Sequence, residues 1–423
     1  MSHVKDPKLA AQGRLKIEYA ESHMPALLKI RADFKKKKPF RGLRIAMALH
    51  VTKETAVLVE TLQQGGAKVA ISSCNPLSTQ DDVAAALAKS GTDVFAYKGE
   101  NKTDYYKFLN KVLDTNPHIT IDDGCDLITL IHTKRKNLLK NLIGGCEETT
   151  TGINRLHAME RDGALKYPII AVNDNKTKHL TDNYYGTGQS SWDGILRATN
   201  ILIAGKTIVV AGYGDCGKGV ALRGKGMGAH VIVTEINPFR ALQATLDGFR
   251  VMKMSEAVRI GDIFITVTGG KHVIAKEHFG KMKSGAILAN AGHFDIEIDT
   301  VALTKMAKKK RSMRPFLDEY TLAGGGANGK KLYLVADGRL CNLGAAEGHP
   351  SEVMALSFAG QALACKYLVD KLNSNEKLPA GVHTLPESID DYIASLQLNA
   401  MGISIDKLTT EQEKYNSGWM EGT

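Results

Sequence analysis

The 423-residue chain lacks several features that mark special classes of protein. It has no apolar run near the 18 residues that a membrane helix needs, and its N-terminal stretch has no hydrophobic segment of the kind found in secretion signals. Its six cysteines are scattered, without a Cys-x-x-Cys pair or any spacing typical of metal ligands. These absences predict a cytoplasmic protein with reduced thiols, no membrane segment and no bound metal.

The composition is ordinary except for its charge, because 55 Lys and Arg against 45 Asp and Glu give a net charge of +10. The basic residues concentrate at 35–40 and 308–314, without the interleaved aromatic residues that favour a nucleic-acid site. Runs of this kind are usually solvated helix ends or loops. We therefore expect no nucleic-acid partner.

Short β-branched runs alternate with amphipathic stretches almost throughout, which predicts an α/β fold with doubly wound, Rossmann-like parallel sheets. In the first series we expect strands at 43–50, 68–73, 93–98, 118–124 and 167–174, and helices at 53–66 and 78–91, the second capped by Ser78 or Thr79. In the second series we expect a helix at 190–205, strands at 206–212, 230–235, 263–269 and 286–292, and a hairpin tip at 323–331 before a strand at 332–337.

The stretch "AGYGDCGKG" at 211–219 fits two phosphate-binding patterns. A P-loop needs Ser or Thr directly after its lysine, because that hydroxyl binds magnesium. Here Lys218 is followed by Gly219, so the P-loop is excluded.

The alternative pattern, Gly212-x-Gly214-x-x-Gly217, is the phosphate turn of a dinucleotide-binding unit. A strand precedes it and a helix follows, so a pyrophosphate would lie at the helix N-terminus. The next strand ends in Glu235, roughly 20 residues on, where an acid meets the adenosine ribose hydroxyls. The pattern predicts NAD as the cofactor, and the acid favours NAD over NADP.

The long helix after residue 350 has no strand partner of its own, so we expect it to cross back and cover the first sheet. The predicted division is a substrate-binding domain at 1–185 completed by 350–385, an NAD-binding domain at 186–349, and a C-terminal segment at 386–423.

Dense polar motifs in the first domain go beyond what a simple dehydrogenase needs. They are "LHVTKET" (49–55), "SSCNPLSTQDD" (72–82), "IDDGCD" (121–126), "CEETTTG" (146–152) and "NDNKTKHLTDN" (173–183). With the glycine turn, "NAGHFDIEID" (290–299) and "GRLCNLGAAEGHPSEVM" (338–354), they resemble the S-adenosylhomocysteine hydrolase family, in order over nearly the whole chain.

The resemblance implies reversible hydrolysis of S-adenosyl-L-homocysteine to adenosine and L-homocysteine by a homotetramer. NAD transiently oxidises the ribose 3′-hydroxyl, the C4′ proton is removed, homocysteine is eliminated, water adds, and the ketone is reduced back. S-inosyl-L-homocysteine stays open as the substrate, because hypoxanthine can also donate a hydrogen bond to a carboxylate. An ordinary NAD-dependent oxidoreductase is the other alternative.

Seven residues are candidates for the chemistry. Lys178 and Asp182, four apart, would share a helical face, and with Glu148 they would place a lysine between two carboxylates at the 3′-hydroxyl. We expect the pKa of this lysine to be lowered by desolvation, so that it takes up the hydroxyl proton. The other four candidates are His50 and Asp123 for proton transfer at C5′ and the sulfur, His293 near the nicotinamide, and Asn183.

For the purine, the family pattern implies Thr52, Glu54, His349 and Met354, with Asp123, Glu148, Lys178 and Asp182 completing the substrate site. The residues expected to bind NAD are Thr149, Thr150, Thr151, Asn183, Gly212, Gly214, Asp215, Cys216, Gly217, Lys218, Gly219, Glu235, Arg240, Ala291, Gly292, His293, Asn342 and His349.

Three features depart from the family pattern. Thr187 stands where many relatives have a cysteine beside the nicotinamide, and Arg240 stands where an asparagine is common near the adenosine ribose. The chain ends in "YNSGWMEGT", without the Lys/Tyr-rich tail that reaches the NAD of a neighbouring protomer in longer relatives. The resemblance is therefore to the shorter archaeal and thermophilic branch.

Overall fold

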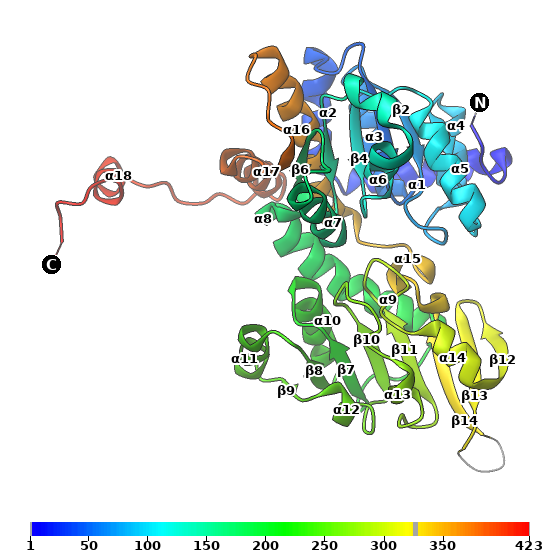
Figure 1. The fold of residues 1–423 in the computed structure, drawn as a ribbon. Helices are drawn as coiled ribbons and strands as arrows, with labels where there is room; N and C mark the ends of the chain where they lie inside the picture. Colours follow the sequence, from blue (N-terminus) through cyan, green and yellow to red (C-terminus); the bar gives the residue numbers. More distant parts are fainter. Residues whose placement is uncertain (1, 325–328, 423) are drawn as a thin grey trace.

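Two sheets organise the chain, each in its own lobe (Figure 1). The computed structural model describes residues 2–324 and 329–422. Within these ranges, no helix is both long and apolar enough to cross a membrane. The expected fold class is confirmed, because both lobes are built on parallel strands with helices on both faces.

The sheet of the first lobe has the order β15-β6-β5-β4-β1-β2-β3, with every neighbouring pair parallel. Its strands are β1 (Arg44–Ala48), β2 (Lys68–Ser72), β3 (Asp93–Phe95), β4 (Ile119–Asp122), β5 (Gly144–Glu147), β6 (Pro168–Ala171) and β15 (Gly381–His383). The strand order reverses at β1, which lies between β2 and β4. Open α/β sheets bind their ligands at such a switch point, beyond the carboxyl ends of the strands.

Alternate residues of β1 enter two different cores, because successive strand side chains point to opposite faces. Ile45 and Met47 pack with α1 (Ala10–Ser22), α2 (Pro25–Lys37), α3 (Lys53–Gln64) and α4 (Asp81–Lys89). Ala46 and Ala48 pack with α5 (Lys102–Leu113), α6 (Asp126–Lys134) and α7 (Thr150–Arg161).

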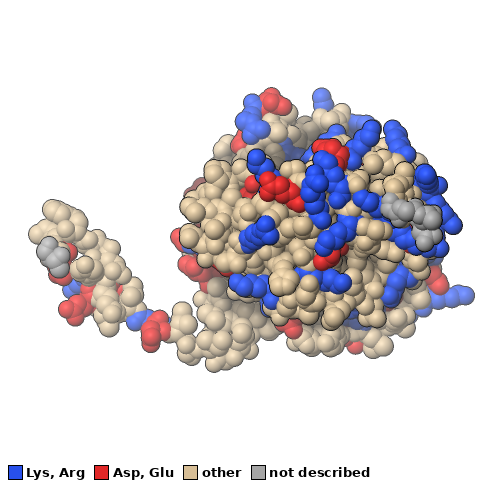
Figure 2. All heavy atoms as spheres, turned by 90° about the horizontal axis from the view of Figure 1, so that it is seen from below, with Lys and Arg blue, Asp and Glu red and all other residues tan. Residues whose placement is uncertain are grey.

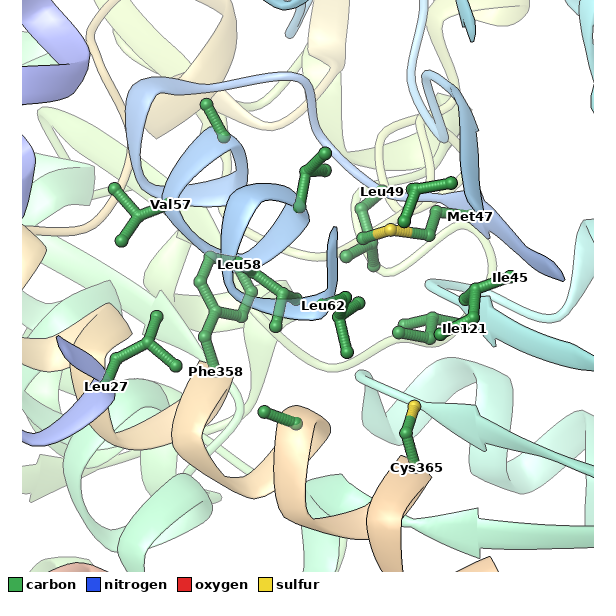
Figure 3. Close-up of a cluster of buried hydrophobic side chains, with 14 of the residues drawn as sticks. Leu27, Ile45, Met47, Leu49, Val57, Leu58, Leu62, Ile121, Phe358 and Cys365 are labelled. Carbon is green, nitrogen blue, oxygen red and sulfur yellow. The ribbon is translucent and has the colours of Figure 1, made fainter. Parts of the chain in front are cut away.

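The long helix α16 (Ser351–Asn373) returns from the second lobe and packs on the first core against α2 and α3. Figure 3 shows its Phe358 and Cys365 facing Leu58, Leu62 and Ile121. We propose that 1–185 with 350–385 forms one domain and 186–349 the other, in line with the membership of the two sheets.

The second sheet has the order β12-β13-β14-β11-β10-β7-β8-β9, and its order reverses at β7. Its strands are β7 (Thr207–Ala211), β8 (His230–Thr234), β9 (Arg250–Val251), β10 (Ile263–Thr266), β11 (Ala286–Asn290), β12 (Ala307–Arg314), β13 (Leu317–Leu322) and β14 (Lys330–Val335). All neighbours are parallel except β12–β13 and β13–β14, which are antiparallel. The helices of this lobe are α9 (Thr187–Thr199), α10 (Asp215–Gly226), α11 (Pro238–Leu246), α12 (Met254–Ala257), α13 (Lys276–Phe279), α14 (Thr300–Met306) and α15 (Cys341–Gly344).

Two local predictions are wrong. The basic run 308–314 is not a helix end or loop but most of the exposed edge strand β12, where lysines discourage pairing with another chain. The N-cap of α4 is Gln80 rather than Ser78 or Thr79. The expected hairpin tip at 323–331 includes 325–328, which lie outside the described residues, but the strands on either side of it are antiparallel.

The surface charge has no single focus on the face seen from below, where Figure 2 shows basic side chains spread among uncharged ones. Two basic residues of β12 are paired, Lys310 with Asp318 at 2.9 Å and Arg311 with Glu319 at 2.8 Å. This arrangement is typical of a solvated surface. The absence of a nucleic-acid partner stays a prediction.

The C-terminal segment has two parts. Helix α17 (Glu387–Ala400) packs against α16 and α2. Beyond it, residues 401–422 are exposed and extend away from the body, with the short helix α18 (Thr410–Ser417) near the end (Figure 1).

Candidate active site

A cavity of about 1030 Å³ lies between the two lobes, beyond the carboxyl ends of their central strands. Its walls include His50 after β1, Asp123 after β4, Gly212 after β7 and Val267 after β10. The switch points of both sheets therefore open into one space, as expected for a site that binds a dinucleotide beside a substrate.

Most of the residues predicted for the site line this cavity, although they come from distant parts of the sequence. They are His50, Thr52, Glu54, Asp123, Glu148, Thr149, Thr150, Thr151, Lys178, Asp182, Asn183, Gly212, Gly214, Asp215, Cys216, Glu235, Arg240, Ala291, Gly292, His293, Asn342, His349 and Met354. Gly217, Lys218 and Gly219 do not line it.

A π-helix positions the lysine cluster. The short helix α8 (Lys176–Lys178) continues into η4 (His179–Gly186), in which backbone hydrogen bonds span five residues. The wider turn lets the side chains four and five residues further on both reach the lysine. Lys178 Nζ donates to Asp182 Oδ1 at 3.0 Å and to Asn183 Oδ1 at 2.8 Å. Glu148 Oε1 lies 3.8 Å from the same nitrogen.

The three charged groups of this cluster are buried, and their pKa values move apart. Burial favours the neutral amine, but Asp182 and Glu148 outweigh it and raise the pKa of Lys178. For Asp182, burial alone would raise the pKa, but Lys178 and His349 lower it. Burial raises the pKa of Glu148 to about 8, although Lys178 opposes the shift.

The expected lowering of the Lys178 pKa is therefore wrong for this arrangement. Desolvation has the predicted sign, but two carboxylates beside one ammonium have the larger effect. Near neutral pH, Lys178 is an ammonium paired with an ionised Asp182. Glu148 is the group of the three that gains or loses a proton in this pH range.

A second cluster joins His50, Asp123 and His293. Asp123 lies between the two rings, with Oδ2 at 3.3 Å from His50 Nε2 and Oδ1 at 3.5 Å from His293 Nδ1. Burial lowers the pKa of His50 to about 4, although Asp123 opposes this, so the ring is a neutral base. Gly124 has φ +103°, and a Cβ there would lie 2.4 Å from His293 Nε2, so only glycine allows this approach.

Cys74, which the sequence did not single out, lies beside this cluster. One donor atom each from His50, Cys74 and Asp123 falls within 4.8 Å of the others, a grouping able to hold a metal ion. The three residues follow three different strands, so their spacing in the sequence does not indicate that they lie together. His50 Nδ1 is hydrogen-bonded to Ser78 Oγ at 2.7 Å.

The carboxylate expected to bind the purine is itself firmly held. Glu54 is buried at 1% exposure, and its Oε1 accepts from Ser351 Oγ at 2.7 Å and lies 3.2 Å from Lys53 Nζ. Lys53 also donates to Glu347 Oε2 at 3.0 Å. Burial acts to lower the pKa of Lys53, but the two carboxylates raise it, so its side chain is an ammonium. Neither Lys53 nor Ser351 was predicted.

The glycine turn has the shape that a dinucleotide needs. Gly212 has φ +111°, and Gly214 is the N-cap of α10, whose first N–H groups therefore face outward. A Cβ at Gly217 would lie 2.1 Å from Gly212 O, so this glycine allows α10 to pack on the end of β7. Glu235 accepts from the backbone N–H of Tyr213 at 2.8 Å, which places it beside the turn.

The remaining glycine of the motif has a packing role. A Cβ at Gly219 would lie 1.9 Å from Tyr184 O, where α10 crosses η4. The turn predicted to face the cofactor is thus packed directly on the π-helix that carries Asp182 and follows Lys178. Thr187, in the position of the usual cysteine, lies 3.3 Å from His349 Nε2 and donates to Cys216 Sγ at 3.5 Å.

Comparison with known proteins decides the family. The model of the S-adenosyl-L-homocysteine hydrolase family matches residues 1–140, and the model of its NAD-binding domain matches 183–348. The chain belongs to the S-adenosyl-L-homocysteine hydrolase family. It is an NAD-dependent hydrolase, and the cavity between its lobes is the place where the predicted NAD and substrate residues meet.

Relatives of this family are similar over their whole length. The S-inosyl-L-homocysteine hydrolase of Methanocaldococcus jannaschii is 60% identical over 423 residues, covering 100% of both chains. The adenosylhomocysteinase of Saccharolobus solfataricus is 56% identical over 421 residues, covering 99% of each. Among solved structures, the NAD-bound 3-phosphoglycerate dehydrogenase of Entamoeba histolytica covers 81% of this chain and 99% of its own, with 13% identity and a TM-score of 0.43, too distant to add to these conclusions.

The close packing at Gly217 predicts a selective loss of NAD binding. In Gly217→Ala the new Cβ must push α10 away from Gly212, so we expect NAD affinity to fall by at least about 10-fold. The measurement is NAD retained after gel filtration, with calorimetric titration of depleted protein. Gly226→Ala is the control, because a Cβ at that position of α10 meets nothing within 4 Å. Equal NAD affinity in the two variants would contradict this role of Gly217.

Proposed function

We propose that this protein hydrolyses the thioether of a purine ribonucleoside linked to homocysteine, with oxidation and re-reduction at the ribose 3′-carbon. The observation that carries the proposal is the buried cluster of Lys178, Glu148 and Asp182 on the wall of the cavity that also contains the dinucleotide turn. Bound NAD supplies the hydride acceptor and later returns the same hydride. An ordinary oxidoreductase would instead release reduced cofactor.

The cluster removes the proton of the 3′-hydroxyl. Glu148 Oε1 is buried and has no hydrogen-bond partner among the described residues, so it is available to a ribose hydroxyl. Because Lys178 is an ammonium in the free site, it cannot take a proton without losing one. We place its Nζ against the 3′-oxygen, so that it gains the hydroxyl proton as it passes one to the ionised Glu148 carboxylate. Asp182 keeps Lys178 in position throughout.

The second cluster handles the elimination. Once C3′ is a ketone, the proton on C4′ is acidic, and loss of that proton expels the sulfur from C5′. Asp123 and the neutral His50 lie together, so they are suited to take the C4′ proton and give one to the leaving thiolate. Water then adds at C5′, and the same groups act in reverse. His293 fixes the second oxygen of Asp123.

Hypoxanthine is the base that the purine pocket favours. The Glu54 side chain needs a donor for its carboxylate oxygen, which hypoxanthine offers at N1–H and adenine at its amino group. The two purines differ in the atom beside that donor, which is the carbonyl oxygen in hypoxanthine and the unprotonated ring nitrogen N1 in adenine. The ammonium of Lys53 lies 3.2 Å from Glu54 but outside the lining of the cavity, so it acts at a distance. Its positive charge favours the more negative carbonyl oxygen over the ring nitrogen. The name of the M. jannaschii relative agrees with this preference.

We also propose a cytoplasmic homotetramer. The six cysteines lie among the described residues and all are free thiols, as expected in a reducing compartment. The exposed segment 401–422 carries Ile405, Leu408 and Trp419, with exposed fractions of 70%, 56% and 89%. An arm with such side chains, extended from the body in Figure 1, is suited to pack on another copy of the chain.

Replacement of the lysine tests the first step. Lys178→Met should retain NAD but lose 3′-oxidation by a factor of about 10² to 10⁴, because the ammonium that passes the hydroxyl proton on to Glu148 is gone. The measurement is the absorbance of reduced nicotinamide after a nucleoside is added. Lys176→Met is the control, since Lys176 is exposed on the same short helix and pairs with Glu387. Reduction at the native rate in Lys178→Met would refute the assignment.

Turnover of the two thioethers tests the purine. We expect kcat/KM for S-inosyl-L-homocysteine to exceed that for the adenosyl compound by about 10-fold or more. Lys53→Met should narrow this ratio, whereas Lys53→Arg, which keeps the charge, should preserve it. The measurement is thiol release from NAD-loaded protein. A higher value for the adenosyl substrate would overturn the hypoxanthine preference, and release of thiol from neither would reject the hydrolase itself.

A further inference from the structure

Two buried polar side chains on α16 have no part in the chemistry described above. Ser357 and Gln361 are both 0% exposed, and they lie four residues apart on one face of the helix. The neighbouring positions Phe358, Ala362 and Cys365 belong to the hydrophobic core. Most buried polar groups are hydrogen-bonded. Gln361 Oε1 has no partner among the described residues, but the donor atoms of both side chains do, and their partners indicate the role of this helix face.

Both partners are carboxylates of the lysine cluster. Ser357 Oγ donates to Asp182 Oδ2 at 3.0 Å. Gln361 Nε2 donates to Glu148 Oε2. One helix, far away in sequence from both acids, thus contacts each of them with a separate side chain.

These two bonds determine which oxygens face the reaction. With Oδ2 held by Ser357 and by His349 at 3.2 Å, Asp182 presents Oδ1 to Lys178. With Oε2 held by Gln361, Glu148 presents Oε1, the atom that lacks a partner among the described residues. Each carboxylate therefore has one oxygen fixed by α16 and one left for the lysine or the ribose.

The helix that carries the two donors is rigidly seated. Phe358 and Cys365 enter the core beside α3 (Figure 3). On its other side, a Cβ at Gly360 would lie 3.1 Å from Val172 Cγ1 and 3.3 Å from Asn175 Nδ2, so the glycine allows α16 to come close to the segment before Lys178. Donors on a packed helix fix a geometry more firmly than donors on a loop.

We propose that Ser357 and Gln361 are positioning residues for the oxidation step: Ser357 holds Asp182 as the partner of Lys178, and Gln361 orients Glu148 so that one oxygen can receive the proton. This inference rests on the proposed function, in which Glu148 gains that proton. Loss of Ser357 and loss of Gln361 should affect the pH profile differently, because Asp182 and Glu148, the carboxyl groups they contact, lose their protons in different pH ranges.

The hydrogen bond that each substitution removes determines how the pH dependence of oxidation changes. A carboxyl group with a raised pKa is ionised only above that value, so the rate of oxidation should rise with pH through about 8, where Glu148 loses its proton. Gln361 donates to the ionised form, and its loss should move this rise to higher pH. Asp182 is ionised over the whole working range, so loss of Ser357 should lower the rate without moving the midpoint.

The experiment is the pH profile of single-turnover reduction of bound NAD by adenosine and by inosine in the holoenzyme. We expect Gln361→Met, which is close in shape, to shift the midpoint upward by about one pH unit, equivalent to about 10-fold in rate below it. Ser357→Ala should lower the plateau and leave the midpoint in place. Val369→Ala is the control, because it removes buried methyl groups from α16 at a position that contacts neither carboxylate.

Glu148→Gln distinguishes the proposed function, in which Glu148 accepts the proton, from the positioning role of Gln361. It should abolish the rise with pH, and adding Gln361→Met to it should change nothing further. If Glu148→Gln keeps the rise, then Glu148 is not the proton acceptor and the proposed function is wrong at this residue. If Glu148→Gln removes the rise but Gln361→Met leaves the midpoint unchanged, or Val369→Ala moves it equally, the positioning role alone is overturned.

Discussion

One buried ammonium shared between two buried carboxylates is the interaction on which the rest of this site depends. A charge left alone in such a place would be strongly destabilised, so the buried charges of Lys178 and Asp182 depend on each other, and Glu148 adds to the attraction when it is ionised. The two carboxyl groups differ because Lys178 and His349 overcome the burial of Asp182 and lower its pKa, whereas the burial of Glu148 outweighs the more distant Lys178 and raises its pKa to about 8. The proposed proton transfer at the sugar uses this difference between the two carboxyl groups.

The fold places this cluster where both ligands can reach it. Each sheet has one point at which its strand order reverses, and the two points face each other across a single cavity. The π-helix η4 lies where the lobes meet, and Gly219 lets α10 pack against it, so the phosphate turn and the lysine cluster share one rigid junction. A cofactor bound at this turn, as proposed, would keep a fixed position relative to the groups proposed to accept the proton.

The sequence predicted what depends on local pattern. The turn at Gly212, the acid Glu235 and the two sheets follow from short-range spacing and from hydrophobic alternation. What it could not show depends on tertiary contact. The π-helix brings Asn183 as well as the predicted Asp182 to Lys178, and the pKa of that lysine is set by residues on other elements. No local signal distinguishes Gln361 from any other polar residue of a helix. The strand at 307–314 was missed because its charge pattern resembles a loop.

The proposed mechanism is the departure of a hydride from the ribose and its return while sulfur is exchanged for water. It is tested most directly by turnover of S-inosyl-L-homocysteine that carries deuterium at the ribose 3′-carbon, with mass spectrometry of the nucleoside product and of free dinucleotide. The mechanism predicts that the product nucleoside retains the deuterium at C3′ and that free dinucleotide gains none. Loss of the label into free dinucleotide at each cycle, or cleavage at an undiminished rate by NAD-free protein, would contradict it.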